Sequence, residues 1–194
     1  MYVISWVFMI IALILTVVSM CDYFIKCAPI FKFNPEDSFS NFSHEGIKNA
    51  QPLPWQASEI VLKDRIQEEA SQVIKLAIDQ NKTLSTAESC TGGLIGGTLT
   101  AISGSSSAVE GGVISYSNNV KQIVLGVSAR DIEQVGAVSS EVAAQMADGS
   151  RKTCQSDIAV SVTGIAGPGG AVPGKPVGTV WFGLSTDSYT KTCL

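Results

Sequence analysis

Apolar and polar positions follow two different periods along the chain from about residue 58 onward. Between residues 58 and 82 the spacing is helical, and the apolar positions are Ile60, Val61, Ile66, Ala70, Val73, Ile74, Ala77 and Ile78. Short apolar runs predict strands at residues 83–88, 112–117, 157–163 and 177–186. The segments between them predict helices at residues 90–102, 118–126, 128–136 and 139–153. This alternation indicates an α/β protein, which we expect to be a three-layer α/β/α sandwich around a mixed sheet.

The first 57 residues have a different character. Residues 3–20 form an uncharged apolar run, near the lower length limit for a membrane-spanning helix. We weigh two interpretations of this run, a membrane anchor and a mispredicted upstream start. Lys26 and Lys32 follow it and would keep the rest of the chain in the cytoplasm, tethered to the inner membrane if the anchor is real. Residues 21–57 show no period, which predicts a linker before a domain at residues 58–194.

Composition and charge exclude several classes of function. Lys and Arg number 13 against 17 Asp and Glu, and no basic cluster is present, which argues against a nucleic-acid-binding surface. The 5 cysteines are scattered without a CxxC pair, so neither a disulfide framework nor a zinc site is expected. The single histidine, His44, lies far from the other candidate groups, which removes His-based triads and most metal sites. We therefore expect chemistry that proceeds without histidine.

Ser89 lies between a predicted strand and a glycine-rich stretch that opens a predicted helix. Its hydroxyl is either a nucleophile beside the outward-pointing N–H groups of a helix N-terminus or only a cap for that helix. The chain has neither GxGxxG nor GxxxxGK[ST], so dinucleotide and triphosphate binding lack support. The adjacent Cys90 is the better nucleophile in principle, but a reactive thiol usually needs a cationic partner such as histidine. We expect Cys90 to pack as a small apolar side chain.

Lys121 follows the segment YSN at the start of a predicted helix. A solvated surface lysine is the ordinary interpretation, but a lysine desolvated in a crowded pocket loses its proton and can act as a base. Because no histidine is available near these residues, Lys121 is our leading candidate to activate a serine hydroxyl. The loop at residues 163–174, rich in Gly and Pro, is either a surface loop or a ligand-binding loop beyond the carboxyl end of a strand.

Four ordered segments, TAESCTGG, YSN…K, GAVS and VTGIAGPGG…KPVGTVW, together resemble the C-terminal domain of the CinA family. The resemblance runs from about residue 59 to the end of the chain. That family includes nicotinamide mononucleotide deamidases, so the resemblance implies hydrolysis of the nucleotide's carboxamide to nicotinate mononucleotide and ammonia, in bacterial pyridine-nucleotide salvage. It implies a serine–lysine mechanism with no metal and no organic cofactor, and it suggests a homo-oligomer.

The resemblance also implies roles for individual residues. Ser89 would be the nucleophile and Lys121 its base, with Tyr116 and Asn118 helping to position the lysine. The oxyanion could be stabilised by backbone N–H groups at Thr91 or Gly92. The glycine-rich loop would line the nucleotide pocket and could hold the phosphate, through Thr163, Gly164, Ala166, Gly167 and Lys175. The helix N-terminus and this loop could exchange the two roles.

The chain departs from the family pattern at its end, STDSYTKTCL. The resemblance implies an arginine-containing segment and a long final helix beyond this point. We therefore expect one face of the sheet to be partly uncovered, which favours association. Two hypotheses stay open, an amidohydrolase with a Ser89–Lys121 pair and a catalytically inactive nucleotide-binding or interaction module.

Overall fold

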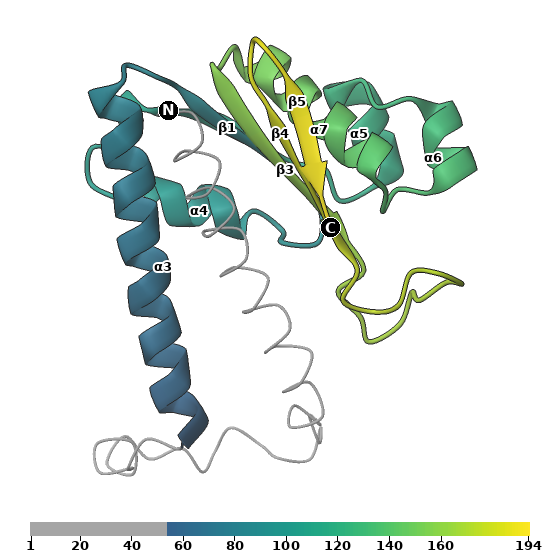
Figure 1. Cartoon of the computed structure of the whole chain (residues 1–194), viewed down its shortest axis with the longest axis horizontal. Helices are drawn as coiled ribbons and strands as arrows, with labels where there is room; N and C mark the ends of the chain where they lie inside the picture. The colour runs from purple at the N-terminus through teal and green to yellow at the C-terminus, as the bar shows by residue number, and fades with distance from the viewer. Residues whose placement is uncertain (1–53) are drawn as a thin grey trace, which may run out of the picture.

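The computed structural model describes the backbone of residues 54–194 and the side chains from residue 64 onward. The apolar run at residues 3–20 and most of the linker predicted at 21–57 lie outside the described residues. The described part has three layers, with helices on both faces of a single mixed sheet (Figure 1). The predicted three-layer α/β/α architecture is confirmed.

The sheet has five strands in the order β2-β1-β3-β4-β5. The pairs β1–β2 and β1–β3 are parallel, whereas β3–β4 and β4–β5 are antiparallel. The parallel strands therefore end at one common edge of the sheet. Their bounds are β1 Leu84–Glu88, β2 Val109–Ile114, β3 Ile158–Gly164, β4 Val180–Ser185 and β5 Thr190–Cys193.

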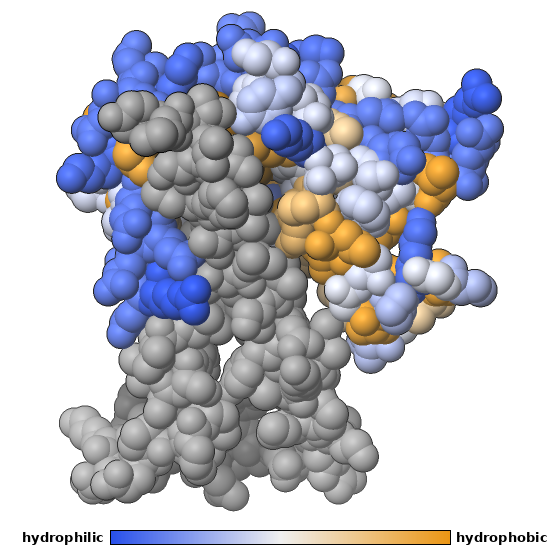
Figure 2. Space-filling model, in the orientation of Figure 1, coloured by the Kyte–Doolittle hydropathy of each residue, from blue (hydrophilic) through white to orange (hydrophobic). Residues whose placement is uncertain are grey.

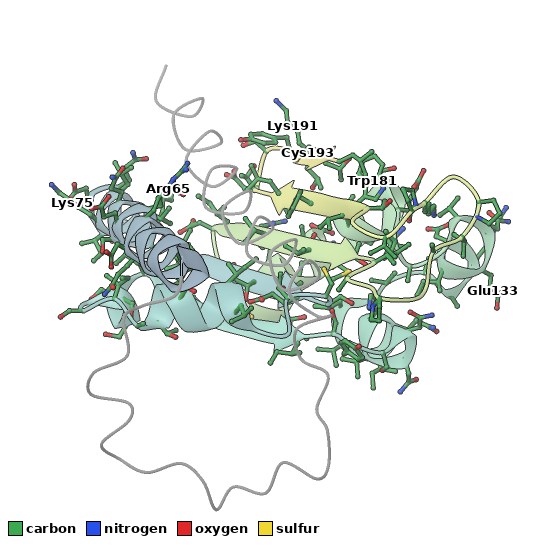
Figure 3. The ribbon with its side chains drawn as sticks, turned by 90° about the horizontal axis from the view of Figure 1, so that it is seen from below. Arg65, Lys75, Glu133, Trp181, Lys191 and Cys193 are labelled. Atoms are coloured by element: carbon green, nitrogen blue, oxygen red, sulfur yellow. The ribbon has the colours of Figure 1, made fainter. Side chains whose placement is uncertain are left out.

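Two helices, α3 (Pro54–Asp79) and α4 (Leu94–Thr100), cover one face of the sheet (Figure 1). The apolar positions predicted for α3 at Ile66, Ala70 and Val73 are buried in a core shared with α4 and the strands. The charged side chain of Lys75 projects from the outer side of α3, away from the sheet (Figure 3), and Arg65 on the same helix is exposed. A helix with one apolar face and one charged face is stabilised mainly by this packing.

The opposite face is covered by α7 (Ser140–Cys154), with α5 (Asn118–Leu125) and α6 (Ala129–Val135) beside it (Figure 1). Small residues on this face let α7 approach the strands closely. Ser161 of β3 donates to the Ala143 carbonyl over 2.6 Å, and a Cβ built on Gly183 of β4 would lie 2.4 Å from that oxygen. Any larger residue at 183 would push the helix away from the sheet.

The structure differs from the sequence prediction in several boundaries. The helix expected at residues 90–102 begins only at Leu94, because the preceding residues form a turn in which Gly92 and Gly93 have positive φ angles. The strand expected at 112–117 is β2, which ends at Ile114. Helix α3 begins at Pro54, within the predicted linker. Strand β5 was not predicted, because all four of its residues are exposed and lack a buried alternation.

Apolar residues gather in the middle of the face shown in Figure 2, near the carboxyl end of the chain. Leu194 at that end is 74% exposed. Exposed apolar surface favours association, which is consistent with the predicted homo-oligomer. The homo-oligomer stays a prediction. Within the described residues, no helix combines the length and apolar character that a membrane crossing requires.

Candidate active site

The common edge of the parallel strands brings sequence-distant polar residues together. Ser89 follows β1, Ser115 follows β2, and Thr163 lies near the end of β3. The Ser89 N–H donates to the Val162 carbonyl over 3.0 Å, which fixes the backbone of Ser89 against β3. Ligands of open α/β sheets bind beyond this edge, so the residues here form the candidate active site.

The amine of Lys121 reaches this edge from the first turns of α5. Its Nζ lies 3.0 Å from Ser89 Oγ, 2.6 Å from the Ser115 carbonyl oxygen and 3.3 Å from the Tyr116 carbonyl oxygen. Lys121 is 1% exposed and Ser89 is 9% exposed, so the contact is shielded from bulk water. The structure thus brings the predicted nucleophile and the predicted base into direct hydrogen-bond contact, although they are separated by 32 positions in the chain.

The surroundings of this amine favour its neutral form. Burial lowers the pKa of Lys121 below its ordinary value of 10.5, and the negative charge of a Cys90 thiolate would act in the opposite direction. A neutral amine has two N–H groups and one lone pair. The carbonyl oxygens of Ser115 and Tyr116 can accept the two N–H bonds, which leaves the lone pair for the Ser89 hydroxyl. In the structure Lys121 Nζ donates to Ser89 Oγ, and deprotonation of the amine would let Ser89 donate to Nζ instead, as general-base catalysis requires.

Ser89 does not cap helix α4, so the alternative interpretation of its hydroxyl as only a helix cap is wrong. The helix begins at Leu94, and the unpaired N–H groups at its start donate to the carboxylate of Glu88 instead. Glu88 Oε2 accepts from Gly93 N at 3.1 Å and from Ile95 N at 3.0 Å, and Oε1 accepts from Gly96 N at 2.7 Å. The Ser89 hydroxyl is therefore not needed for capping. An internal carboxylate therefore already occupies the anion-favouring end of this helix.

Cys90 packs between the turn and the end of β3. It contacts the core cluster that lies under α3 and α4, which confirms the expectation that it packs as an apolar side chain. A Cβ built on Gly164 would lie 3.1 Å from Cys90 Sγ and 2.8 Å from Val180 Cγ2. Only glycine fits there without displacing one of these neighbours.

Tyr116 and Asn118 do not position Lys121 through their side chains in this structure. Tyr116 is 78% exposed, and Asn118 is exposed at the start of α5. The lysine is held by the backbone carbonyls of Ser115 and Tyr116 instead. Sequence analysis missed Ser115, because a contact through a backbone carbonyl leaves no mark on the residue type.

The turn between β1 and α4 limits which N–H groups can stabilise an oxyanion. The Gly92 N–H donates to the Ser89 carbonyl over 3.1 Å, so it is already engaged. The Thr91 N–H has no acceptor among the described residues, which makes it the better of the two predicted donors. Thr91 Oγ1 is buried and also lacks a hydrogen-bond partner. A buried polar group without a partner is rare and often marks a ligand contact.

The glycine-rich loop that follows β3 is tied to the connection between α6 and α7. Thr163 Oγ1 donates to the Ala137 carbonyl over 2.8 Å, and the Lys175 amine donates to the Val135 carbonyl near the end of α6. The loop residues Ala166 and Gly167 are half-buried. Their roles in nucleotide binding stay predictions.

Comparisons with known proteins identify the family of this chain. The family model of the CinA C-terminal domain matches residues 66–193. This chain belongs to the CinA C-terminal domain family. A CinA-like protein from Synechococcus sp. is 52% identical over 116 residues, which are 60% of this chain and 28% of that protein. The chain therefore spans less than a third of the length of that relative.

Solved structures of the family share the fold. The competence/damage inducible protein CihA from Agrobacterium tumefaciens matches with a TM-score of 0.64 at 42% identity, over 66% of this chain and 78% of that one. A competence-damaged protein (CinA) superfamily protein from Escherichia coli matches with a TM-score of 0.62 at 34% identity, over 64% and 72%. The Ser89–Lys121 contact thus lies within a domain of this family.

Proposed function

We propose that this chain hydrolyses the carboxamide of nicotinamide mononucleotide to nicotinate mononucleotide and ammonia, as a step of pyridine-nucleotide salvage. Membership of the CinA C-terminal domain family supports this choice of substrate. The single observation that carries the mechanism is the 3.0 Å contact between Lys121 Nζ and Ser89 Oγ. A buried amine against a serine hydroxyl is a recognised way to activate an oxygen nucleophile.

The chemistry proceeds through two acyl-transfer steps. Ser89 Oγ attacks the carboxamide carbon, and its proton passes to the lone pair of Lys121. The protonated Lys121 gives this proton to the leaving nitrogen, the carbon–nitrogen bond breaks, and ammonia departs, which leaves nicotinate mononucleotide esterified to Ser89. Water, deprotonated by Lys121, then attacks the ester, and the proton returns to Ser89 as nicotinate mononucleotide is released. The Thr91 N–H is our candidate donor to the oxyanion formed in each step.

The substrate phosphate is placed on the loop after β3. Glycines allow the backbone N–H groups of such a loop to approach an anion closely, and Lys175 adds a positive charge. Lys175 donates a hydrogen bond to the Val135 carbonyl, and an ammonium group has three N–H donors, so it can contact a phosphate as well. This placement agrees with the occupation of the α4 N-terminus by Glu88.

Ammonia release from nicotinamide mononucleotide by the full-length chain tests the proposal. We expect the native chain to release ammonia and both Ser89→Ala and Lys121→Ala to abolish this turnover. Cys90→Ala, at the residue next to Ser89, is the matched control and should retain turnover. Undiminished turnover in either of the first two variants would reject the pair. Nucleotide binding by calorimetry without ammonia release would instead favour the inactive binding module.

A further inference from the structure

Glu88 is a buried carboxylate to which the proposed chemistry gives no part. It is 1% exposed, and among the described residues it forms no ion pair. Buried carboxylates normally have a cationic partner or a complete set of hydrogen bonds. Glu88 has the second, because its two oxygens accept three backbone N–H groups, those of Gly93, Ile95 and Gly96. These bonds fasten the end of β1 to the start of α4.

The backbone of Glu88 extends this connection to the catalytic amine. Its carbonyl oxygen accepts from the Ser115 N–H at 2.7 Å, and the Ser115 carbonyl accepts from Lys121 Nζ at 2.6 Å. Lys121 Nζ in turn contacts Ser89 Oγ at 3.0 Å, and Ser89 is covalently joined to Glu88. Glu88, Ser89, Lys121 and Ser115 thus form a closed ring of contacts.

The residues around the carboxylate leave little room for it to move. A Cβ built on Gly96 would lie 3.4 Å from Glu88 Oε1 and 3.3 Å from Thr86 Oγ1. The glycine at 96 therefore allows the helix start to approach the carboxylate to hydrogen-bond distance. Because both oxygens of Glu88 are bonded, rotation of the side chain would break at least one bond to the turn that carries Ser89.

We propose that Glu88 is a positioning residue, whose carboxylate fixes the β1–α4 turn so that Ser89 Oγ and Lys121 Nζ stay in reactive contact. This inference rests on the proposed function. Glu88 touches neither substrate nor the reacting atoms. A neutral glutamine has only one acceptor oxygen and presents an N–H to backbone donors, so Glu88→Gln leaves at least one N–H of the turn without an acceptor. The turn then shifts, and the nucleophile with it.

Two activity measurements on the full-length chain test this role. The first is kcat and KM for ammonia release from nicotinamide mononucleotide. The second is the rate at which a fluorophosphonate labels Ser89, in which Oγ bonds to phosphorus, fluoride leaves, and the proton passes through Lys121 to water. We expect Glu88→Gln to lower kcat and the labelling rate together, by roughly 10- to 100-fold, with KM unchanged, because small displacements of reacting groups have effects of this size.

Asp157→Asn is the matched control for a role in stability alone. Asp157 also accepts a backbone N–H, that of Thr83 at 2.9 Å, but it lies at the opposite end of β1. We expect this variant to unfold at lower urea concentration while kcat stays unchanged. A folded Glu88→Gln protein with unchanged kcat and labelling rate overturns the proposal. The proposal is also overturned if, in both variants, the loss of activity is fully explained by the loss of folded protein.

Further outcomes separate this inference from the proposed function. If the native chain labels Ser89 in a Lys121-dependent manner but releases no ammonia, the substrate is wrong and the labelling rates alone decide the role of Glu88. If it does neither, both proposals are overturned. If Glu88→Gln does not fold, Gly96→Ala decides, because it displaces the carboxylate and keeps its charge. A normal labelling rate in a folded Gly96→Ala protein then counts against the proposal.

Discussion

Replacing Lys121 by methionine should remove activity while leaving the protein at least as stable as the native chain at neutral pH. Lys121 is 1% exposed, and burial lowers its pKa, so the folded state disfavours the charged form relative to the unfolded chain. Replacing a buried ion pair with apolar residues of similar volume is neutral or stabilising by about 1–4 kcal/mol, and we take this range as the upper bound for the single amine of Lys121. The Ser115 and Tyr116 carbonyls both lose their donor, which offsets about 2 kcal/mol of this gain. We expect a net increase of up to about 2 kcal/mol in the free energy of unfolding.

The pH dependence of this difference has a definite sign. Burial lowers the pKa of Lys121 in the folded state, whereas in the unfolded chain the amine titrates near 10.5. Between these two pKa values the unfolded state binds one proton more than the folded state, so the native protein gains stability as the pH rises. The gain is at most about 1.4 kcal/mol per pH unit, and Lys121→Met lacks it. The stability advantage of the variant must therefore shrink as the pH approaches 10.5.

Urea unfolding followed by circular dichroism measures both proteins from neutral pH upward. Lys75→Met is the matched control, because Lys75 is exposed on the outer side of α3 (Figure 3) and its replacement should give a small, pH-independent change. A Lys121→Met variant that is clearly less stable than the native chain at neutral pH, with a difference that does not change with pH, would refute the reasoning. It would mean that the buried amine stays charged and contributes to stability.

Three further substitutions have expected outcomes. Gly183→Ala should lower the free energy of unfolding by about 1–3 kcal/mol in urea, because its Cβ would meet the Ala143 carbonyl oxygen at 2.4 Å. Asp157→Asn should cost about 1 kcal/mol at neutral pH. The Thr83 N–H lowers the pKa of Asp157 below 3.8, so this contribution is present above 3.8 and is lost as the pH falls through the lowered pKa, where the two acid-unfolding curves should converge. Thr91→Val should raise stability by about 1 kcal/mol, because it removes a buried hydroxyl without a partner, and should weaken nucleotide binding in calorimetry.

The elements with a strong period were predictable from the sequence. Helix α7 lies within one residue of its predicted bounds at both ends, and β1 and β3 differ only slightly from theirs. Each of these elements buries a regular set of apolar or small side chains, so its period reflects its packing. The start of α4 was not predictable in this way. Small residues show no clear period, and two glycines with positive φ form a turn where a helix was expected.

The sequence predicted the main residues of the candidate site, but it did not predict the backbone contacts that hold them in place. The absence of a suitable histidine directed attention to Lys121, and the structure places its amine against Ser89. The sequence did not reveal Glu88 or Ser115, because their contacts involve backbone groups brought together by the sheet. A carboxylate on the face of β1 that also carries the buried Leu84 was the available signal for Glu88. An acidic residue at such a position needs hydrogen-bond donors nearby.

The most direct test of the account is to trap the acyl enzyme. The full-length chain is mixed with nicotinamide mononucleotide, quenched rapidly in acid, digested and analysed by mass spectrometry. We predict an ester between Ser89 and nicotinate mononucleotide in the native chain, and none in Lys121→Met. An ester or thioester on Cys90, or steady ammonia release with no acylated Ser89, would contradict the claim that a neutral lysine activates this serine.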